Sequence, residues 1–346
     1  MKHGWFRPAI IVALAATLVL AGAGSGLAAK KKPVEIVWPP PPEKARFKYL
    51  ETLRSSDDVS SGFSVALRKL VLGSNSAQVR LKLPYGVAVD SKGRIYVADY
   101  GYATVAVFDK KAKKAWYLGK TATTTLAGPV GLAIGPGDTV FVADTKLQRV
   151  FKFSPEGQIL YVLGSKKEFD SPSGVAVDKA QDVLYVVDSQ LHKVLKFRAS
   201  DGTPLGSLGE RGRGNGQFNF PTNIWVDQKT GRLLVSDTMN FRVQIFDRQG
   251  NFLKAFGEAG DGPGMMARSR GVAVDTDGHI YVVDAAFNNF QVFNDQGQLL
   301  LWVGQGGVGP GQFNSPAGIF IDEQNRVYVA DRLNARVQII QFLGGD

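Results

Sequence analysis

From about residue 84 onward, short apolar segments alternate with polar positions in a period of two, and turn residues separate them. Each copy of this pattern reads Pro-x-Gly-apolar-x-apolar-Asp, a turn, apolar-Tyr-Val-x-Asp, a short loop and Val-x-x-Phe, as in PYGVAVDSKGRIYVAD. The second aspartate of the copies falls at Asp99, Asp144, Asp188, Asp237, Asp284 and Asp331. Alternation of this kind predicts short β-strands, and self-similarity at about 46 residues predicts a propeller or a solenoid.

Each copy holds enough strand segments for one propeller blade. The two motif strands are followed by a third, at 149–153, 242–247 and 336–341, and by a fourth, at 158–164 and 252–257. Four short antiparallel strands per repeat are typical of a blade. The sequence therefore predicts an all-β fold, a six-bladed β-propeller of four-stranded antiparallel blades over residues 84–346.

The sixth copy lacks an outer strand, because the chain reaches Asp346 after three strands. Residues 45–54 (ARFKYLETLR) alternate sufficiently to form one strand. We expect this N-terminal strand to pair with the last blade and close the ring, which removes an edge that would otherwise favour aggregation.

The six in-register copies resemble the NHL-repeat family of six-bladed propellers. The resemblance covers about 84–346, with closure from 45–54. It implies the fold specifically and the function weakly, because the family includes scaffolds, RNA binders and lyases.

The region before the repeats divides into three parts. Residues 1–28 combine a basic start, an uncharged apolar run and small residues, which predicts a cleaved secretory signal peptide or, as an alternative, an uncleaved membrane anchor. Residues 29–44 form a basic, proline-rich linker, in which Lys30, Lys31 and Lys32 could contact an anionic membrane surface. Residues 45–83 hold the closing strand and a short amphipathic helix at 63–72. We therefore expect an exported protein of the periplasm or the outside, anchored to the inner membrane if the signal is not cleaved.

Composition narrows the chemistry. The chain has 0 Cys and 3 His, which excludes disulfides, cysteine-ligated metals and a three-histidine metal site in the folded region. The net charge is +10, but it lies mainly in residues 1–83, and the propeller is nearly neutral. Export and this near neutrality disfavour nucleic-acid binding.

The repeated aspartates are interpreted as structural. In three blades an arginine follows five residues after the aspartate, and we expect ion pairs that make the intervening loop rigid: Asp144 with Arg149, Asp237 with Arg242, and Asp331 with Arg336. A second set of aspartates ends the first strand of a copy, where Asp commonly caps a turn; its members are Asp90, Asp178, Asp227, Asp275 and Asp322.

Function is expected on the loops at one end of the ring, namely those between the second and third strands and those between blades. Aromatic residues, arginines and amides gather there, a composition that suits a protein–protein interface. The candidate binding residues are Tyr85, Tyr100, Tyr102, Lys146, Gln190, His192, Met239, Asn240, Phe241, Arg268, Arg270, Phe287, Asn288 and Arg332. Phe220 and Phe313 are expected to pack between blades.

The preferred hypothesis is a non-catalytic scaffold that binds a protein or a ligand in the cell envelope, as a monomeric ring with unidentified envelope partners. We predict no catalytic residue, no cofactor and no bound metal. The alternative is a metal-dependent propeller enzyme with its site at the channel mouth. The segment at His192 looks like part of the peptide-amidating lyase, but the equivalent loops carry Lys146, Met239 and Phe287 instead of histidines. Asn223 and Asn240 are conceivable ligands for a central calcium in a lactonase-like site, for which no suitable Glu is identified.

Overall fold

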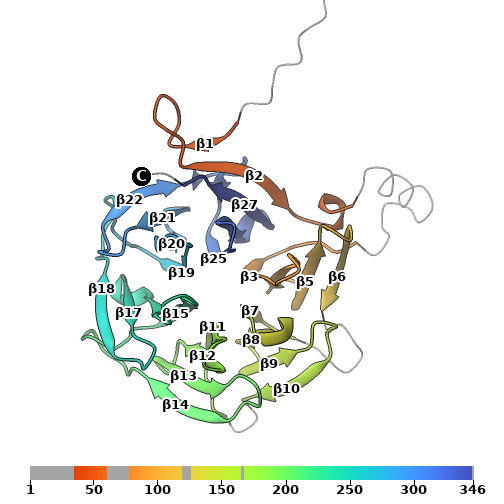
Figure 1. Cartoon of the computed structure of the whole chain (residues 1–346), viewed down its shortest axis with the longest axis vertical. Helices are drawn as coiled ribbons and strands as arrows, with labels where there is room; N and C mark the ends of the chain where they lie inside the picture. The colour runs from red at the N-terminus through yellow and green to blue at the C-terminus, as the bar shows by residue number, and fades with distance from the viewer. Residues whose placement is uncertain (1–34, 61–77, 119–125, 165–166, 345–346) are drawn as a thin grey trace, which may run out of the picture. The chain divides into compact units, whose positions relative to one another are not determined.

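The computed structural model describes residues 35–60, 78–118, 126–164 and 167–344. These residues form a ring of six antiparallel sheets, a six-bladed β-propeller (Figure 1). The fold predicted from the repeat pattern is therefore confirmed. In every blade the motif strand that starts with Pro-x-Gly or its equivalent is innermost, and the sheet order runs outward from it.

The first three blades are built from the following strands. Blade 1 contains β3 (Pro84–Val89), β4 (Ile95–Asp99), β5 (Thr104–Asp109) and β6 (Lys114–Leu118). Blade 2 contains β7 (Pro129–Ile134), β8 (Val140–Asp144), β9 (Arg149–Phe153) and β10 (Ile159–Leu163). Blade 3 contains β11 (Pro172–Asp178), β12 (Val183–Asp188), β13 (Lys193–Arg198) and β14 (Pro204–Leu208).

The other three blades repeat this order, and short elements join them. Blade 4 contains β15 (Pro221–Val226), β16 (Leu233–Asp237), β17 (Arg242–Phe246) and β18 (Phe252–Phe256). Blade 5 contains β19 (Ser269–Val274), β20 (Ile280–Asp284), β21 (Asn289–Phe293) and β22 (Leu299–Val303). Blade 6 contains β25 (Pro316–Ile321), β26 (Arg326–Asp331), β27 (Arg336–Phe342), β2 (Phe47–Leu53) and β1 (Val37–Trp38). The short elements are η1 (Ser56–Asp58), η2 (Pro136–Asp138), η3 (Thr238–Asn240), η4 (Arg332–Asn334), β23 (Gln305–Gly306) and β24 (Gln312–Phe313).

The ring closes through β2, which pairs antiparallel with β27 and supplies the outer strand that blade 6 lacks. The closing strand expected at 45–54 is thus confirmed. Phe47 and Leu53, near its two ends, are fully buried. Phe47 packs into the largest core cluster, which joins blades 5 and 6.

The proline-rich segment is not a spacer. Val37 and Trp38 in β1 pair with Lys48 and Phe47, so the prolines form the connection of a β-hairpin whose first strand is a fifth strand of blade 6. The indole of Trp38 covers Gly311, where an added Cβ would lie 2.4 Å from the ring. The expected linker therefore stops short of residue 35, and the compact unit begins at Glu35.

The glycine of the Pro-x-Gly motif lets neighbouring inner strands touch. A Cβ at Gly131 would lie 2.3 Å from the carbonyl oxygen of Ser173 in the next blade, and Gly86 and Gly318 are packed equally tightly. Blade 4 has Asn223 at this position. Its side-chain oxygen accepts a hydrogen bond from the Val272 amide (3.5 Å), so it bridges to blade 5.

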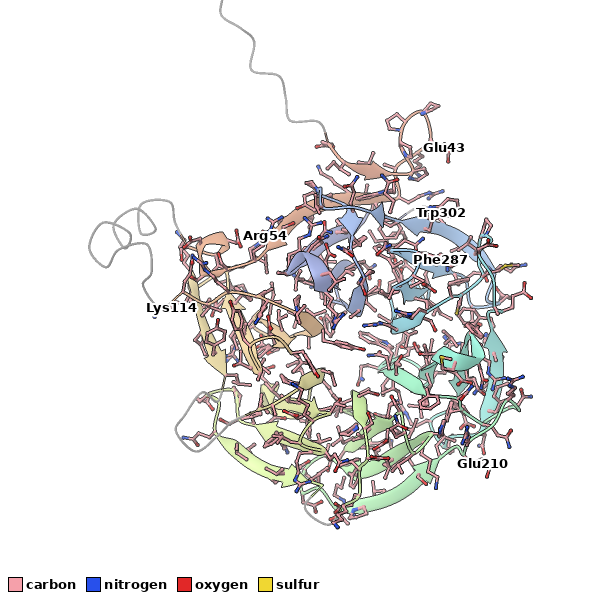
Figure 2. All side chains as sticks on the ribbon, turned by 180° about the vertical axis from the view of Figure 1, so that it is seen from behind. Glu43, Arg54, Lys114, Glu210, Phe287 and Trp302 are labelled. Carbon is pink, nitrogen blue, oxygen red and sulfur yellow. The ribbon has the colours of Figure 1, made fainter. Side chains whose placement is uncertain are left out.

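Five of the six outer strands carry a β-bulge with a leucine at the bulged position. These leucines are 40–50% exposed. They are Leu50, Leu160, Leu205, Leu253 and Leu300. Trp302, in the same outer layer, is 52% exposed and lies at the circumference of the ring (Figure 2).

Several predictions fall outside the described residues: the signal peptide at 1–28, Lys30 to Lys32, and the helix at 63–72. Within the described part of the chain, no helix has both the length and the hydropathy needed to span a membrane.

Candidate binding surfaces

The ring has two ends with different loops. We call the end that carries the connections between blades and the loops between second and third strands the crossover face. The opposite end, with the turns between first and second and between third and fourth strands, is the turn face.

Buried aspartates hold the loops of the crossover face. The aspartate that ends each second strand is 0% exposed in all six blades. The carboxylate of Asp188, for example, accepts the amides of Asp170 (2.7 Å) and Ser171 (2.9 Å) in the connection from the preceding blade, and that of Leu191 (3.1 Å) in its own loop. Each aspartate thus fixes two segments of this face, which is the structural role expected for it.

Two of the three expected ion pairs are present. Arg242 lies 2.9 Å from Asp237, and Arg336 lies 2.6 Å from Asp331, both with buried carboxylates. In these blades an asparagine and a glutamine donate to the same carboxylate oxygen. They are Asn240 and Gln244 in blade 4, and Asn334 and Gln338 in blade 6.

The ion pair predicted between Asp144 and Arg149 is wrong. The guanidinium of Arg149 instead donates to the carbonyls of Leu147 and Gln148. Blade 2 has Leu147 and Phe151 where the other two blades have the amide side chains, and the backbone amides of the loop and the connection occupy the Asp144 carboxylate. The polar network that would hold the guanidinium is therefore missing.

Apolar side chains stand at the tips of the second-to-third-strand loops in all six blades. Three of the six, Tyr102, Met239 and Phe287, are predicted from the sequence. The other three, Leu147, Leu191 and Leu333, are not. Phe287 is partly exposed, and the others are 36–50% exposed. We call these six residues the loop-tip ring. The sequence signal that locates all six is an apolar residue two or three positions after the repeated aspartate.

Cationic and aromatic residues lie around the loop-tip ring, and the following ones are predicted binding residues except for Lys82. The ammonium group of Lys146 lies 4.5 Å from the ring centre of Tyr100, and that of Lys82 lies 5.6 Å from Tyr102. Gln190 and Arg268 are exposed, whereas Phe241 and Arg332 are partly buried.

Three predicted binding residues have structural contacts instead. His192 is only 6% exposed, and its Nδ1 accepts the Phe220 amide (3.1 Å) with the two rings 4.6 Å apart. It belongs to the contact between blades 3 and 4, so its assignment to an exposed binding face is wrong. Asn240 donates to Asp237, and Asn288 accepts the Ser315 amide (2.7 Å). Phe220 and Phe313 both lie between blades as expected, Phe313 fully buried and Phe220 partly so.

A cavity of about 1430 Å³ follows the axis of the ring and reaches the turn face. Of the predicted binding residues, Tyr85 and Arg270 line it, at its inner end. The remaining members of that set lie outside its wall.

A side-chain cluster is repeated near the turn-face end of the cavity in blades 1, 5 and 6, and its three aspartates line the cavity. An aspartate that ends the first strand accepts a hydrogen bond from a tyrosine hydroxyl and contacts an arginine or histidine four residues later. Burial raises the pKa of all three tyrosines above its ordinary range. The clusters are Asp90–Arg94–Tyr96, Asp275–His279–Tyr281 and Asp322–Arg326–Tyr328.

These aspartates also cap their turns as predicted, since Oδ1 of Asp90 accepts the amides of Lys92 (3.0 Å) and Arg94 (2.9 Å). Their carboxylates are thereby occupied by donors from the protein itself. Across the described ranges, no group of three or more His, Cys, Asp or Glu side chains is arranged to hold a metal ion.

Comparison with known proteins agrees with this architecture. The family model of the teneurin NHL domain matches residues 110–308, more than half of the chain, and that of the NHL repeat matches residues 81–108 and 313–340. NHL repeat-containing protein 3 of Mus musculus is 31% identical over 192 residues, which are 49% of this chain and 54% of that protein. Peptidyl-glycine alpha-amidating monooxygenase B of Xenopus laevis is 30% identical over 165 residues, 44% of this chain and 19% of that protein.

The chain thus spans about half or less of the length of these curated relatives. Among solved structures, a gluconolactonase from Xanthomonas campestris superposes with a TM-score of 0.58 at 17% identity, covering 75% of this chain and 86% of that one. At this identity the likeness concerns the fold alone.

Proposed function

Because the chain belongs to the NHL-repeat family of β-propellers, we propose that it is an exported binding scaffold that docks a partner protein on its crossover face. The docking site in this proposal is the loop-tip ring, with the cations and aromatic residues around it. The N-terminal signal-like sequence supports export to the cell envelope.

The observation that carries the proposal is the loop-tip ring itself. Single exposed apolar residues are common on protein surfaces, but here all six blades present an exposed or partly exposed one, two or three residues after the repeated aspartate. Burying such side chains is the main source of affinity in protein interfaces, and tyrosine and methionine are enriched there.

The rigid support of the loops adds to this argument. Each loop is held by a fully buried carboxylate and by hydrogen bonds to the preceding connection, so little conformational entropy is lost when a partner binds. A rigid scaffold that presents variable loops is the usual arrangement in binding proteins.

The proposal can be tested by site-specific photo-cross-linking in the native envelope. A photoreactive phenylalanine analogue is placed at Met239 and, as a matched control, at Leu253. Both positions belong to blade 4, and their side chains are 50% and 48% exposed. We expect a discrete adduct from position 239 that disappears when Leu191 and Leu333 are changed to Asp.

Adducts of the same mass from both positions would contradict docking on the crossover face. The absence of any adduct from position 239 and from position 102 would contradict it as well. Thermal unfolding of each variant shows whether the propeller is intact.

A further inference from the structure

The inner end of the central cavity is a ring formed by the middle residue of each Pro-x-Gly segment or its equivalent. All six side-chain positions line the cavity. They are Tyr85, Val130, Ser173, Thr222, Arg270 and Ala317. One of them, Arg270, carries a charge.

Arg270 crosses the inner end of the cavity. It belongs to blade 5, and its guanidinium carbon lies 5.4 Å from the ring centre of Tyr85 in blade 1, so it reaches past blade 6. Its Nη1 is shielded from solvent and has no hydrogen-bond partner among the described residues. A guanidinium nitrogen in this state lacks the acceptor that buried polar groups normally have.

The other arginines that line the cavity already have counter-ions. Arg326 contacts Asp322 and Arg232 contacts Asp295, both within 2.7 Å. Lysines at the mouth, such as Lys229, are exposed to water. Arg270 therefore combines a position at the inner end of the cavity with a positive charge that no described carboxylate neutralises.

Three residues after the inner-end position, the inner strands of blades 4 and 6 place aromatic side chains in the cavity wall. Trp225 of blade 4 and Phe320 of blade 6 meet edge to face with ring centres 5.6 Å apart, and both line the cavity. Blades 2 and 3, on the other side of the ring, have alanine at the same strand position, which leaves space opposite the aromatic pair. These residues are Ala133 and Ala176, and both line the cavity.

We propose that the central cavity binds a small organic anion, a carboxylate on an apolar or aromatic body. The carboxylate accepts hydrogen bonds from the guanidinium of Arg270, and the body lies against Trp225 and Phe320. Guanidinium groups pair well with carboxylates, and ligand sites are mostly apolar with a few placed polar groups. The cavity volume of about 1430 Å³ accommodates a molecule of drug-like size. This site is separate from the loop-tip ring, and it does not depend on the docking proposal.

The test uses 4-phenylbutyrate as the probe, with its neutral amide and its amine analogue as matched ligands, and isothermal titration calorimetry on the full chain. We expect the carboxylate to bind at least about tenfold more tightly than the amide and the amine not to bind. Arg270→Gln should weaken binding of the carboxylate at least about tenfold and leave the amide unaffected, and Arg270→Lys should restore part of the loss.

Lys229→Gln is the matched control for general attraction by positive charge at the mouth, and it should change the affinity less than about twofold. Tryptophan fluorescence reports where the ligand lies. Binding of the probe should change this fluorescence in the parent protein, and the change should largely vanish in Trp225→Phe. Thermal unfolding of each variant shows that the ring is intact.

Three results would overturn the proposal. They are equal binding of the carboxylate and the amide, equal losses from Arg270→Gln and Lys229→Gln, and no binding of the probe at millimolar concentration.

Discussion

The closing strand should hold the ring together through one side chain, Phe47. This residue is 0% exposed, and its ring lies 5.1–6.0 Å from those of Phe342, Phe290 and Tyr281. Phe290 and Tyr281 belong to blade 5, so Phe47 joins the N-terminal strand to the neighbouring blade as well as to its own. Replacement by alanine removes these contacts at the point where the ring closes.

The expected magnitude follows from complete burial. Truncation of a buried phenylalanine to alanine costs about 3–5 kcal/mol through lost transfer free energy and the cavity left behind. Leu50 provides a matched control, since it lies in the same strand but at the bulge, where it is 40% exposed. Leu50→Ala should change the free energy of unfolding by about 0.5 kcal/mol or less.

The assay is urea unfolding followed by far-ultraviolet circular dichroism, with both variants compared to the parent protein. A shift in the urea midpoint without a change in slope reports a loss of stability of the native ring. If Phe47→Ala and Leu50→Ala lower the free energy of unfolding by similar small amounts, β2 does not stabilise the closed ring as its pairing with β27 indicates.

Three further predictions follow from contacts in the ring. Gly131→Ala should destabilise by about 1–3 kcal/mol, because the new Cβ would lie 2.3 Å from the carbonyl oxygen of Ser173; thermal unfolding measures this, and an unchanged midpoint would refute the tight packing of inner strands. Hydrogen bonds from Lys254 and Arg232 lower the pKa of Asp295, so its stabilising effect is present above the unfolded pKa and is lost as pH falls through the lowered folded value. Asp295→Asn should therefore reduce stability at pH 7 and have little effect at pH 2, and urea midpoints at the two pH values check the difference. A chelator should leave the melting temperature unchanged, because donors from the protein occupy the repeated aspartates of the turns and loops. A large drop, with about one calcium or zinc per chain by elemental analysis, would instead support the metal-dependent enzyme.

The repeat pattern predicts the blades because each repeat obeys the same local rule. Period-2 alternation, the turn residues and the aspartate at the strand end are all short-range signals. The closing strand at 45–54 follows from counting strands against blades, and Phe47 and Leu53 are buried as that pairing requires.

What the sequence does not predict depends on contacts between blades. His192 is a polar residue in a loop where binding residues are expected, but its imidazole accepts a hydrogen bond from Phe220 at the start of the next blade. Asp144 and Arg149 have the spacing of an ion pair, yet the pair needs amide side chains that blade 2 lacks. The proline run does not predict the hairpin, because the pairing of Val37 with Lys48 depends on the closed blade 6.

The sequence predicts the candidate binding surface in part. Tyr102, Met239 and Phe287 were identified as aromatic or sulfur-containing residues, whereas leucines at the same loop position read as ordinary core residues. Exposure of a leucine depends on the direction of the loop, which the sequence pattern does not give. The sequence predicts a channel but not the chemistry of its wall, because that wall combines residues from the inner strand of every blade.

The most direct test of the docking proposal is the affinity of the cross-linked partner, once purified, for charged variants of the two apolar surfaces. Met239→Asp combined with Leu333→Asp should weaken binding at least about a hundredfold, because both side chains lie in the loop-tip ring. Leu253→Asp combined with Leu300→Asp, at equally exposed positions on the circumference, should leave the affinity within about twofold. Equal affinity of both double variants for the partner would contradict the assignment of the crossover face as the docking surface.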